Sequence, residues 1–273
     1  MSLCRADKVL LGGGAAMLGG SMLFGMPLGL AVPASAFAAV MLDGIFRPTS
    51  STFYPTISNG PRTGSEVSLT FDDGPDPEVT PAVLDILGAA NARGTFFTIG
   101  RHLERHTDIG ARIVREGHEL GNHSWRHAYW QNAYSTSQHA ADMTRSDSII
   151  HGITGTIARP LYRPPVGLKS PGLARVAHAR NLNVIAWSVH SRDTIIRDAR
   201  KIADKVLSRI QPGDIVLMHD GHDLDGRHRK GVIAALPLIL QGLQELGLRS
   251  VTTSQLLREQ LRDHGREIQQ TAD

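Results

Sequence analysis

The stretch that most constrains the fold is a short apolar run that ends in two adjacent carboxylates. Residues 67–71 read Val-Ser-Leu-Thr-Phe, and Asp72, Asp73, Gly74 and Pro75 follow them directly. A short apolar run bounded by turn residues is typical of a buried strand. Neighbouring carboxylates repel each other, so burying both is costly unless a cation lies beside them. Although a bare Asp-Gly pair is more often a solvated turn, the run predicts a strand that delivers acids to a metal site.

Predicted strands and helices alternate after this run. Strands are predicted at 94–100, 118–121, 161–163, 183–189, 214–218 and 248–251, and helices at 77–92, 102–115, 135–150, 171–180, 199–210, 231–246 and 254–262. Repeated strand-helix units indicate an α/β fold with a parallel sheet, which is either a closed barrel or an open doubly wound sheet. Asp72, His123, Arg163, Asp193 and His219 each follow a predicted strand, at the edge where barrels carry their active sites.

Two histidines add the ligands that a metal site needs. His123 and His127 lie four residues apart, and on a helical turn that spacing points both imidazoles the same way. Alone such a pair is usually incidental, but with Asp72 and Asp73 upstream it completes a set of two imidazoles and one carboxylate. That set suits one divalent ion, Zn²⁺ first, with Co²⁺, Ni²⁺ or Fe²⁺ as alternatives. The single cysteine, Cys4, excludes an internal disulfide and a cysteine-based zinc site.

Five segments, taken in order, resemble the motifs of the polysaccharide deacetylase family, also called NodB-homology or carbohydrate esterase family 4 enzymes. The segments are Asp72-Asp73, His123-Ser124-Trp125-Arg126-His127, Arg163-Pro164-Pro165, Asp193 and Leu217-Met218-His219. The resemblance covers residues 66–257, about one domain. It implies a distorted (β/α) barrel of seven or eight units.

The resemblance also implies a role for each motif residue. Asp73, His123 and His127 would hold the metal, and Asp72 would be the general base. His219 would be the general acid, with Asp193 as its partner. Arg163 would orient the base, and the backbone N–H of Val166 would bind the oxyanion. The substrate groove would be lined by Pro165, Val166, Trp187 and Leu217.

The chain departs from the family pattern around the groove. Val166 replaces a usual aromatic residue, His190 stands where Asp or Asn is common, and Thr194 follows Asp193 in place of Trp. These changes affect the shape of the sugar groove more than the chemistry. A further group of His222, Asp223, Asp225 and His228 resembles a second metal cluster, but the Gly and charged residues around it favour a mobile loop.

The predicted function is metal-dependent hydrolysis of an N-acetyl group from an amino-sugar-containing glycan, a non-peptide carbon-nitrogen bond. Peptidoglycan, chitin oligomers, an exopolysaccharide and O-acetylated xylan remain open as substrates. A deacylase of a membrane lipid-linked sugar is the alternative, and an inactive glycan-binding homologue a third interpretation. The net charge is only +3 and the basic residues are dispersed, so we expect no nucleic-acid partner, and no obligate protein partner is evident.

The N-terminal stretch concerns membranes. Residues 9–42 carry no charge, which predicts a signal-anchor or transmembrane segment over residues 1–42. A linker or strap is predicted at 43–65, the deacetylase domain at 66–257 and a polar tail at 258–273. Arg5 and Lys8 before the stretch would place the domain outside the cytoplasmic membrane after a single crossing. A helical hairpin would return it to the cytoplasm, and cleavage near Ala36 would release it as a secreted protein.

Overall fold

The strand that carries the paired acids lies at the centre of a parallel sheet. The structure, a computed structural model, describes residues 3–24, 28–156, 161–224, 229–258 and 260–261. β2 (Glu66–Asp72) pairs on one side with β3 (Gly94–Thr98) and on the other with β7 (Ile215–His219). β4 (Glu119–Asn122) extends the sheet beyond β3, and β6 (Val189–His190) extends it beyond β7. Three short strands complete the set. β8 (Arg249–Ser250) pairs with the start of β2, and β1 (Thr56–Ile57) pairs with β5 (Val184–Ile185).

Single-residue bridges carry the pairing round toward a closed ring. Tyr162 bridges in parallel to Asn122 at the end of β4 and to Val184 in β5. β5 and β6 belong to the same segment, and β6 pairs with β7. The pairing therefore runs from β6 through β7, β2, β3, β4 and Tyr162 back to the segment where it began. The parallel α/β architecture is thus confirmed, with the ring of contacts that a distorted barrel requires.

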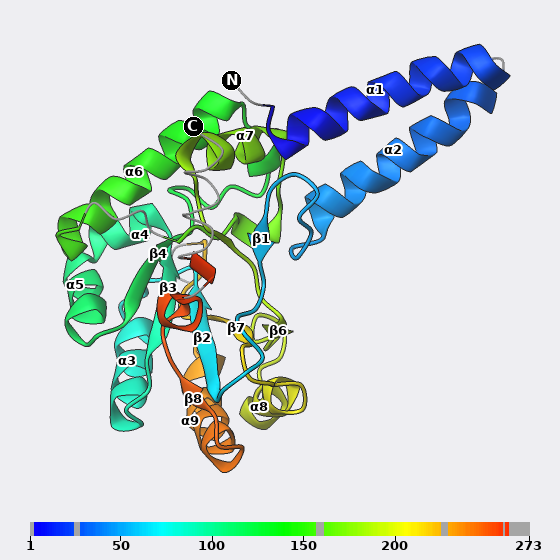
Figure 1. Ribbon diagram of the computed structural model, residues 1–273. Coiled ribbons are helices and arrows are strands. Elements are labelled where there is room, and N and C mark those ends of the chain that lie inside the picture. The colour runs from blue at the N-terminus through cyan, green and yellow to red at the C-terminus, as the bar shows by residue number, and fades with distance from the viewer. Residues whose placement is uncertain (1–2, 25–27, 157–160, 225–228, 259, 262–273) are drawn as a thin grey trace.

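Helices cover the outside of the strands (Figure 1). They are α3 (Val79–Ala89), α4 (Gly100–Arg105), α5 (Thr107–Arg115), α6 (Thr136–Thr154), α7 (Pro171–Arg180), α8 (Ala199–Leu207), α9 (Gly231–Glu245) and α10 (Thr253–Leu256), with 3₁₀ turns η1 (Gln131–Ala133) and η2 (Pro165–Gly167). The largest apolar cluster joins β2, β3 and β7 to α3, α5, α8 and α9, and Phe71 stacks on Phe96 within it. Because side chains of parallel strands are covered by helices, the strand interiors read as apolar runs.

Two predicted strands are shorter than expected. The strand predicted at 161–163 is reduced to the bridge at Tyr162, and the one predicted at 183–189 is interrupted between β5 and β6. At the break between β5 and β6, the buried guanidinium of Arg163 donates to the carbonyl oxygens of Ile185 and Ala186 at 3.4 and 3.0 Å. Carbonyl oxygens that accept hydrogen bonds from a side chain do not pair with a neighbouring strand, so the strand is interrupted there.

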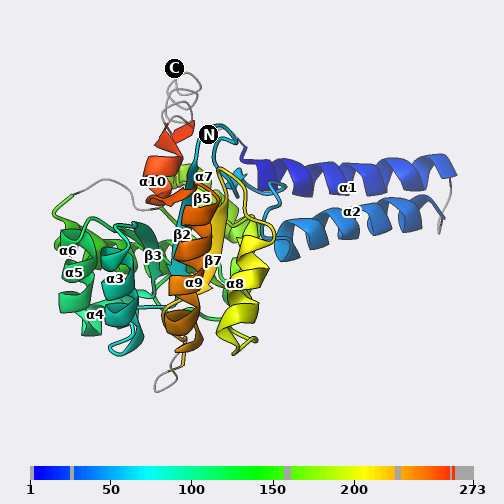
Figure 2. The same cartoon turned by 90° about the horizontal axis from the view of Figure 1, so that it is seen from below.

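The N-terminal stretch forms two antiparallel helices that project from the domain. α1 (Arg5–Phe24) and α2 (Leu28–Phe46) lie side by side, as Figures 1 and 2 show from two directions. The base of this hairpin packs on the domain. Cys4 and Ala6 are buried in a cluster with Leu173 of α7, and Asp7 pairs with Arg175 at 2.7 Å. α2 ends at Phe46, four residues beyond the predicted boundary at residue 42.

The helices of the described ranges do not combine the length and the apolar character needed to cross a bilayer. The predicted membrane segment therefore gains no support from the structure. The predicted strap at 43–65 lies on the domain, where the Lys169 ammonium donates to the carbonyl oxygens of Pro48 and Ser50 at 2.7 and 2.6 Å. Most of the predicted tail at 258–273 falls outside the described residues.

Candidate active site

The two acids lie at the end of the central strand, where parallel strands finish together. Asp72 is in register with Phe97 of β3 and His219 of β7, so the sheet itself brings the acid and the histidine to one edge. Asp73 has a φ of 74°, which turns its side chain out of the strand direction. Both carboxylates are buried, with 3% and 5% of their residue surface exposed. Paired acids at this depth require compensating positive charge.

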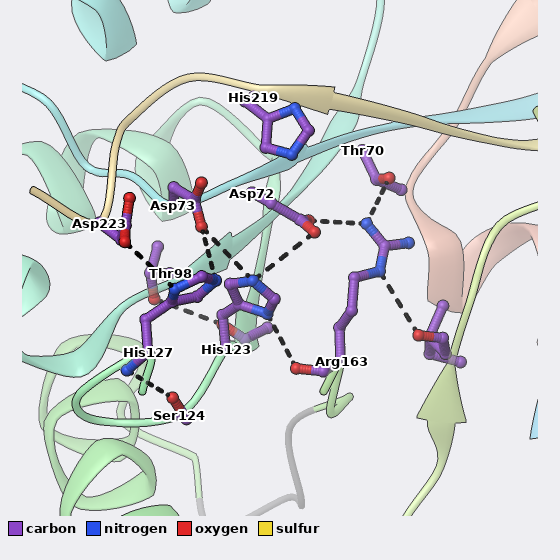
Figure 3. Close-up of polar contacts among 12 residues, drawn as sticks. Thr70, Asp72, Asp73, Thr98, His123, Ser124, His127, Arg163, His219 and Asp223 are labelled. Atoms are coloured by element: carbon purple, nitrogen blue, oxygen red, sulfur yellow. Dashed lines mark hydrogen bonds and ion pairs between the residues drawn. The ribbon is translucent and has the colours of Figure 1, made fainter. Parts of the chain in front are cut away.

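Asp73, His123 and His127 converge on one point (Figure 3). The Oδ1 atom of Asp73 lies 3.5 Å from Nε2 of His123 and 3.3 Å from Nε2 of His127. Each of these residues offers one ligand atom, and the three atoms lie within 4.8 Å of one another. The prediction of a shared helical turn was wrong. Positive φ angles at Ser124 (66°) and His127 (52°) bring the rings together instead, and Ser124 Oγ accepts from the His127 N–H at 3.0 Å.

The donor atoms fit a metal ion. Nδ1 of His123 donates to the carbonyl oxygen of Arg163 at 2.8 Å, so in the neutral imidazole the lone pair is on Nε2, which faces Asp73. Asp73 Oδ1 is buried and has no hydrogen-bond donor among the described residues. Lone pairs that face one another without a proton between them repel, and a cation removes that repulsion. Burial lowers the pKa of His127 to about 4 against the opposing charge of Asp73, which keeps that imidazole neutral as a ligand must be.

Arg163 holds the other acid. Its guanidinium has no exposed surface and donates to Asp72 Oδ1 and Thr70 Oγ1, both at 2.7 Å. It also lies over the Phe97 ring, 4.0 Å from the centroid. With its remaining donors taken by the carbonyls of Ile185 and Ala186, the guanidinium fixes Asp72 in one orientation.

His219 faces the acids from the opposite side. In Figure 3 the carboxylates of Asp72 and Asp73 lie between the His219 ring and the two other imidazoles. Asp193 Oδ1 lies 2.9 Å from His219 Nδ1, and Asp193 Oδ2 accepts from the His219 backbone N–H at 2.8 Å. Burial alone would lower the pKa of His219, but the charge of Asp193, aided by Asp73 and Asp72, raises it to about 9. This imidazole therefore carries a proton at neutral pH.

A cavity of about 210 Å³ opens between these groups. Among the predicted residues, it is lined by Asp72, Asp73, His123, His127, Val166, Trp187, Leu217 and His219. Arg163 and Asp193 are buried behind the acids and His219, and Pro165 is buried in η2 without lining the cavity. Val166 has a φ of 47° and is 47% exposed, so its side chain stands at the rim. A larger hollow of about 1000 Å³ lies elsewhere, between α3 and α9, and contains none of the predicted site residues.

Some residues of the site were not predicted. Thr70 orients Arg163, and the cavity is also lined by Tyr129, Gly167, Thr194, Asp223 and Arg229. Thr70 occupies an inward position of β2 two residues before Asp72, which the strand period indicates. Asp223 was assigned to a mobile loop, yet it is only 5% exposed. Of its predicted neighbours in that cluster, Asp225 and His228 lie outside the described residues.

This arrangement on a parallel α/β sheet defines a hydrolase with a centre of two carboxylates and two histidines, opposed by a protonated histidine. Residues 59–185 match the family described as Polysaccharide deacetylase. A peptidoglycan-N-acetylglucosamine deacetylase of Bacillus cereus is 36% identical over 198 residues, which cover 70% of this chain and 88% of the relative. The chain belongs to the polysaccharide deacetylase family and is an amidohydrolase of that family.

Two further comparisons agree with this assignment. A chitooligosaccharide deacetylase of Bradyrhizobium sp. is 33% identical over 188 residues, covering 66% of this chain and 85% of the relative. A crystal structure of a peptidoglycan N-acetylglucosamine deacetylase superposes with a TM-score of 0.70 at 32% identity, covering 74% of this chain and 92% of that one. The α/β fold with its parallel sheet is therefore shared with solved deacetylases.

Proposed function

We propose that this enzyme removes the acetyl group from N-acetylglucosamine residues of a glycan, with peptidoglycan strands as the first candidate substrate. The observation that carries the proposal is the convergence of Asp72, Asp73, His123 and His127 opposite His219 in one small cavity. The similarity to deacetylases of peptidoglycan and chitooligosaccharides supports the same substrate class. The products would be acetate and a free sugar amine.

Asp73, His123 and His127 would hold one divalent ion, with zinc the first candidate for this set of donors. When bound, the ion would act as a Lewis acid that polarises the amide carbonyl and acidifies water. Asp72, oriented by Arg163, takes a proton from the attacking water, whose oxygen forms the new bond to the carbonyl carbon. The backbone N–H of Val166 donates to the oxyanion that develops.

The carbon-nitrogen bond then breaks, and His219 gives its proton to the leaving amine. The position of His219 supports this role because it faces the carboxylates across the cavity and its pKa of about 9 keeps it protonated at neutral pH. Asp193 stabilises the charged imidazole through a 2.9 Å contact to Nδ1. Asp72 would therefore act as the base for the attacking water and His219 as the acid for the leaving amine.

The test combines metal content with activity on a substrate panel. Purified protein is expected to contain close to one zinc per chain, to lose activity on chelation, and to release acetate from N-acetylated peptidoglycan and chitin oligomers. His123→Ala should lower metal occupancy, whereas Arg175→Ala, at a surface ion pair with Asp7, should not. Full metal content and activity in His123→Ala would refute the metal assignment. Acetate release only from acetylated xylan would refute the substrate class.

A lipid-linked amino sugar is the second candidate substrate, favoured by the apolar N-terminal hairpin. Leu11, Leu18 and Val32 on its surface are 61%, 67% and 67% exposed. We propose that this hairpin lies on the outer face of the cytoplasmic membrane without crossing it, so that the catalytic domain is outside. Apolar attachment resists salt, so the full-length protein should remain with membranes after a high-salt wash. Recovery in the soluble fraction would refute the attachment.

A further inference from the structure

The loop after β7 places the buried carboxylate of Asp223 beside the His127 ring, on the Nδ1 side. Asp223 Oδ2 lies 4.0 Å from Nδ1 of His127, and Figure 3 shows this carboxylate on the side of the ring away from His123. The His127 side chain is 5% exposed, and its Nδ1 has no hydrogen-bond partner among the described residues. A buried donor without an acceptor is costly, so a nearby carboxylate has a clear physical use.

His123 and His127 differ in the hydrogen bonding of Nδ1, the ring nitrogen that faces away from Asp73. His123 donates from Nδ1 to the carbonyl oxygen of Arg163 at 2.8 Å, which fixes its tautomer and leaves the Nε2 lone pair for a metal. His127 also directs Nε2 at Asp73, but no carbonyl of the described ranges forms a hydrogen bond with its Nδ1. The carboxylate of Asp223 is the group that lines the cavity beside that nitrogen.

We propose that Asp223 is a positioning residue for the metal site, one that accepts a hydrogen bond from His127 Nδ1–H and so keeps the Nε2 lone pair directed at the ion. This inference rests on the proposed function. At 4.0 Å the pair is longer than a hydrogen bond, and a small side-chain rotation or one bridging water closes the difference. Carboxylates behind metal-bound histidines fix ring orientation and raise ligand basicity.

Two side chains contact the Asp223 carboxylate, and a third contacts the backbone of the same loop. His222 Nδ1 lies 2.8 Å from Asp223 Oδ1, and the Arg101 guanidinium donates to the Asp223 backbone carbonyl. The Tyr129 hydroxyl hydrogen-bonds to the same carboxylate, and this bond is the main reason why the pKa of Tyr129 is raised to about 12. Arg101 contacts the backbone of the loop, whereas the side chain of Asp223 faces Nδ1 of His127. The two roles can therefore be separated by mutation.

The experiment measures Zn²⁺ affinity of the full chain by competition with a chromophoric chelator. Asp223→Ala should weaken zinc binding by about 10- to 100-fold, the usual loss when such a partner is removed. Asp223→Asn, which retains an acceptor oxygen and the shape, should lose less and serves if the alanine variant folds poorly. Arg101→Met, which releases the loop but keeps the carboxylate, is the matched control and should bind zinc within about twofold of wild type.

Three outcomes would overturn this inference. They are zinc affinity of Asp223→Ala within about twofold of wild type, an equal loss in Arg101→Met, and a loss in Asp223→Asn as large as in Asp223→Ala. The second would show that the loop matters and the carboxylate does not. If wild-type protein binds no zinc, the proposed metal site itself fails. Normal wild-type binding with an unaffected Asp223→Ala variant refutes only the role of Asp223.

Discussion

Replacing Asp193 with Asn tests whether this carboxylate keeps the proposed acid protonated. In protein freed of metal, the pKa of His219 is about 9 against an ordinary value of 6.5, and Asp193 is the largest cause of the increase. One pKa unit corresponds to about 1.4 kcal/mol, so the difference is worth about 3 kcal/mol of stability. Asn keeps the shape and one acceptor oxygen but removes the charge. The pKa of His219 in Asp193→Asn should therefore fall from about 9 toward its ordinary value, because the charge of Asp193 no longer opposes the effect of burial.

The sign of the pH dependence follows from the direction of the shift. Because the folded-state pKa of His219 lies above its unfolded value, this stabilisation is fully present below pH 6.5 and is lost as the pH rises through about 9. The gap in unfolding free energy between wild type and Asp193→Asn should therefore be largest near pH 6, on the order of 3 kcal/mol, and should shrink toward pH 10.

The assay is urea unfolding of chelator-treated protein at a series of pH values, with an NMR titration of His219. Comparing two variants at each pH cancels the other titrating groups that they share. Asp108→Asn, a change at an exposed carboxylate in the first turn of α5, is the control and should follow wild type. A His219 pKa that stays near 9 in Asp193→Asn, or a gap in stability that does not vary with pH, would refute the reasoning.

The remaining predictions concern the other buried groups. Arg163→Met leaves the Asp72 carboxylate buried without its partner and should lower the unfolding free energy by about 3–5 kcal/mol, whereas Arg175→Met, at an ion pair whose arginine side chain is 43% exposed, should cost less than about 1 kcal/mol in the same urea titration. Equal losses would show that Arg163 is not a structural partner of Asp72. His219→Ala should retain zinc and lose about 10²- to 10⁴-fold in kcat/KM on N-acetylated glycans. It should lose less on an activated aryl acetate, whose leaving group needs no proton. Loss of zinc, or an equal loss on both substrates, would remove His219 from the role of leaving-group acid.

The cluster of Asp73, His123 and His127 could be predicted because its members lie in short segments. Asp72 and Asp73 end a strand that is recognisable by its apolar run, and the two histidines are four residues apart. The reason given for their meeting was nevertheless wrong, since positive φ angles at Ser124 and His127, and no helical turn, bring the rings together. The strand period and residue spacing thus indicated which side chains meet, but not the backbone that joins them.

Contacts between distant segments could not be predicted. Arg163 and Asp72 are 91 residues apart, and the interruption between β5 and β6 follows from where the Arg163 guanidinium points. Asp223 lies among Gly and charged residues that are typical of a solvated loop, so its sequence gives no sign of burial. Its place beside His127 depends on the course of the loop after β7, which local pattern does not determine.

The loop that carries Val166 packs between Pro48 and Trp187. Gly167 has a φ of +71°, and a Cβ atom added there would lie 2.8 Å from Pro48 of the strap and 2.8 Å from Trp187. Lys169 ties the same loop to the strap through the Pro48 and Ser50 carbonyls. The backbone of this loop is therefore costly to vary, whereas the exposed Val166 side chain is not. Divergence in sugar preference within this lineage would then proceed by changing the residue at position 166 on an unchanged loop, because any side chain at position 167 is strained by the positive φ and meets both Pro48 and Trp187.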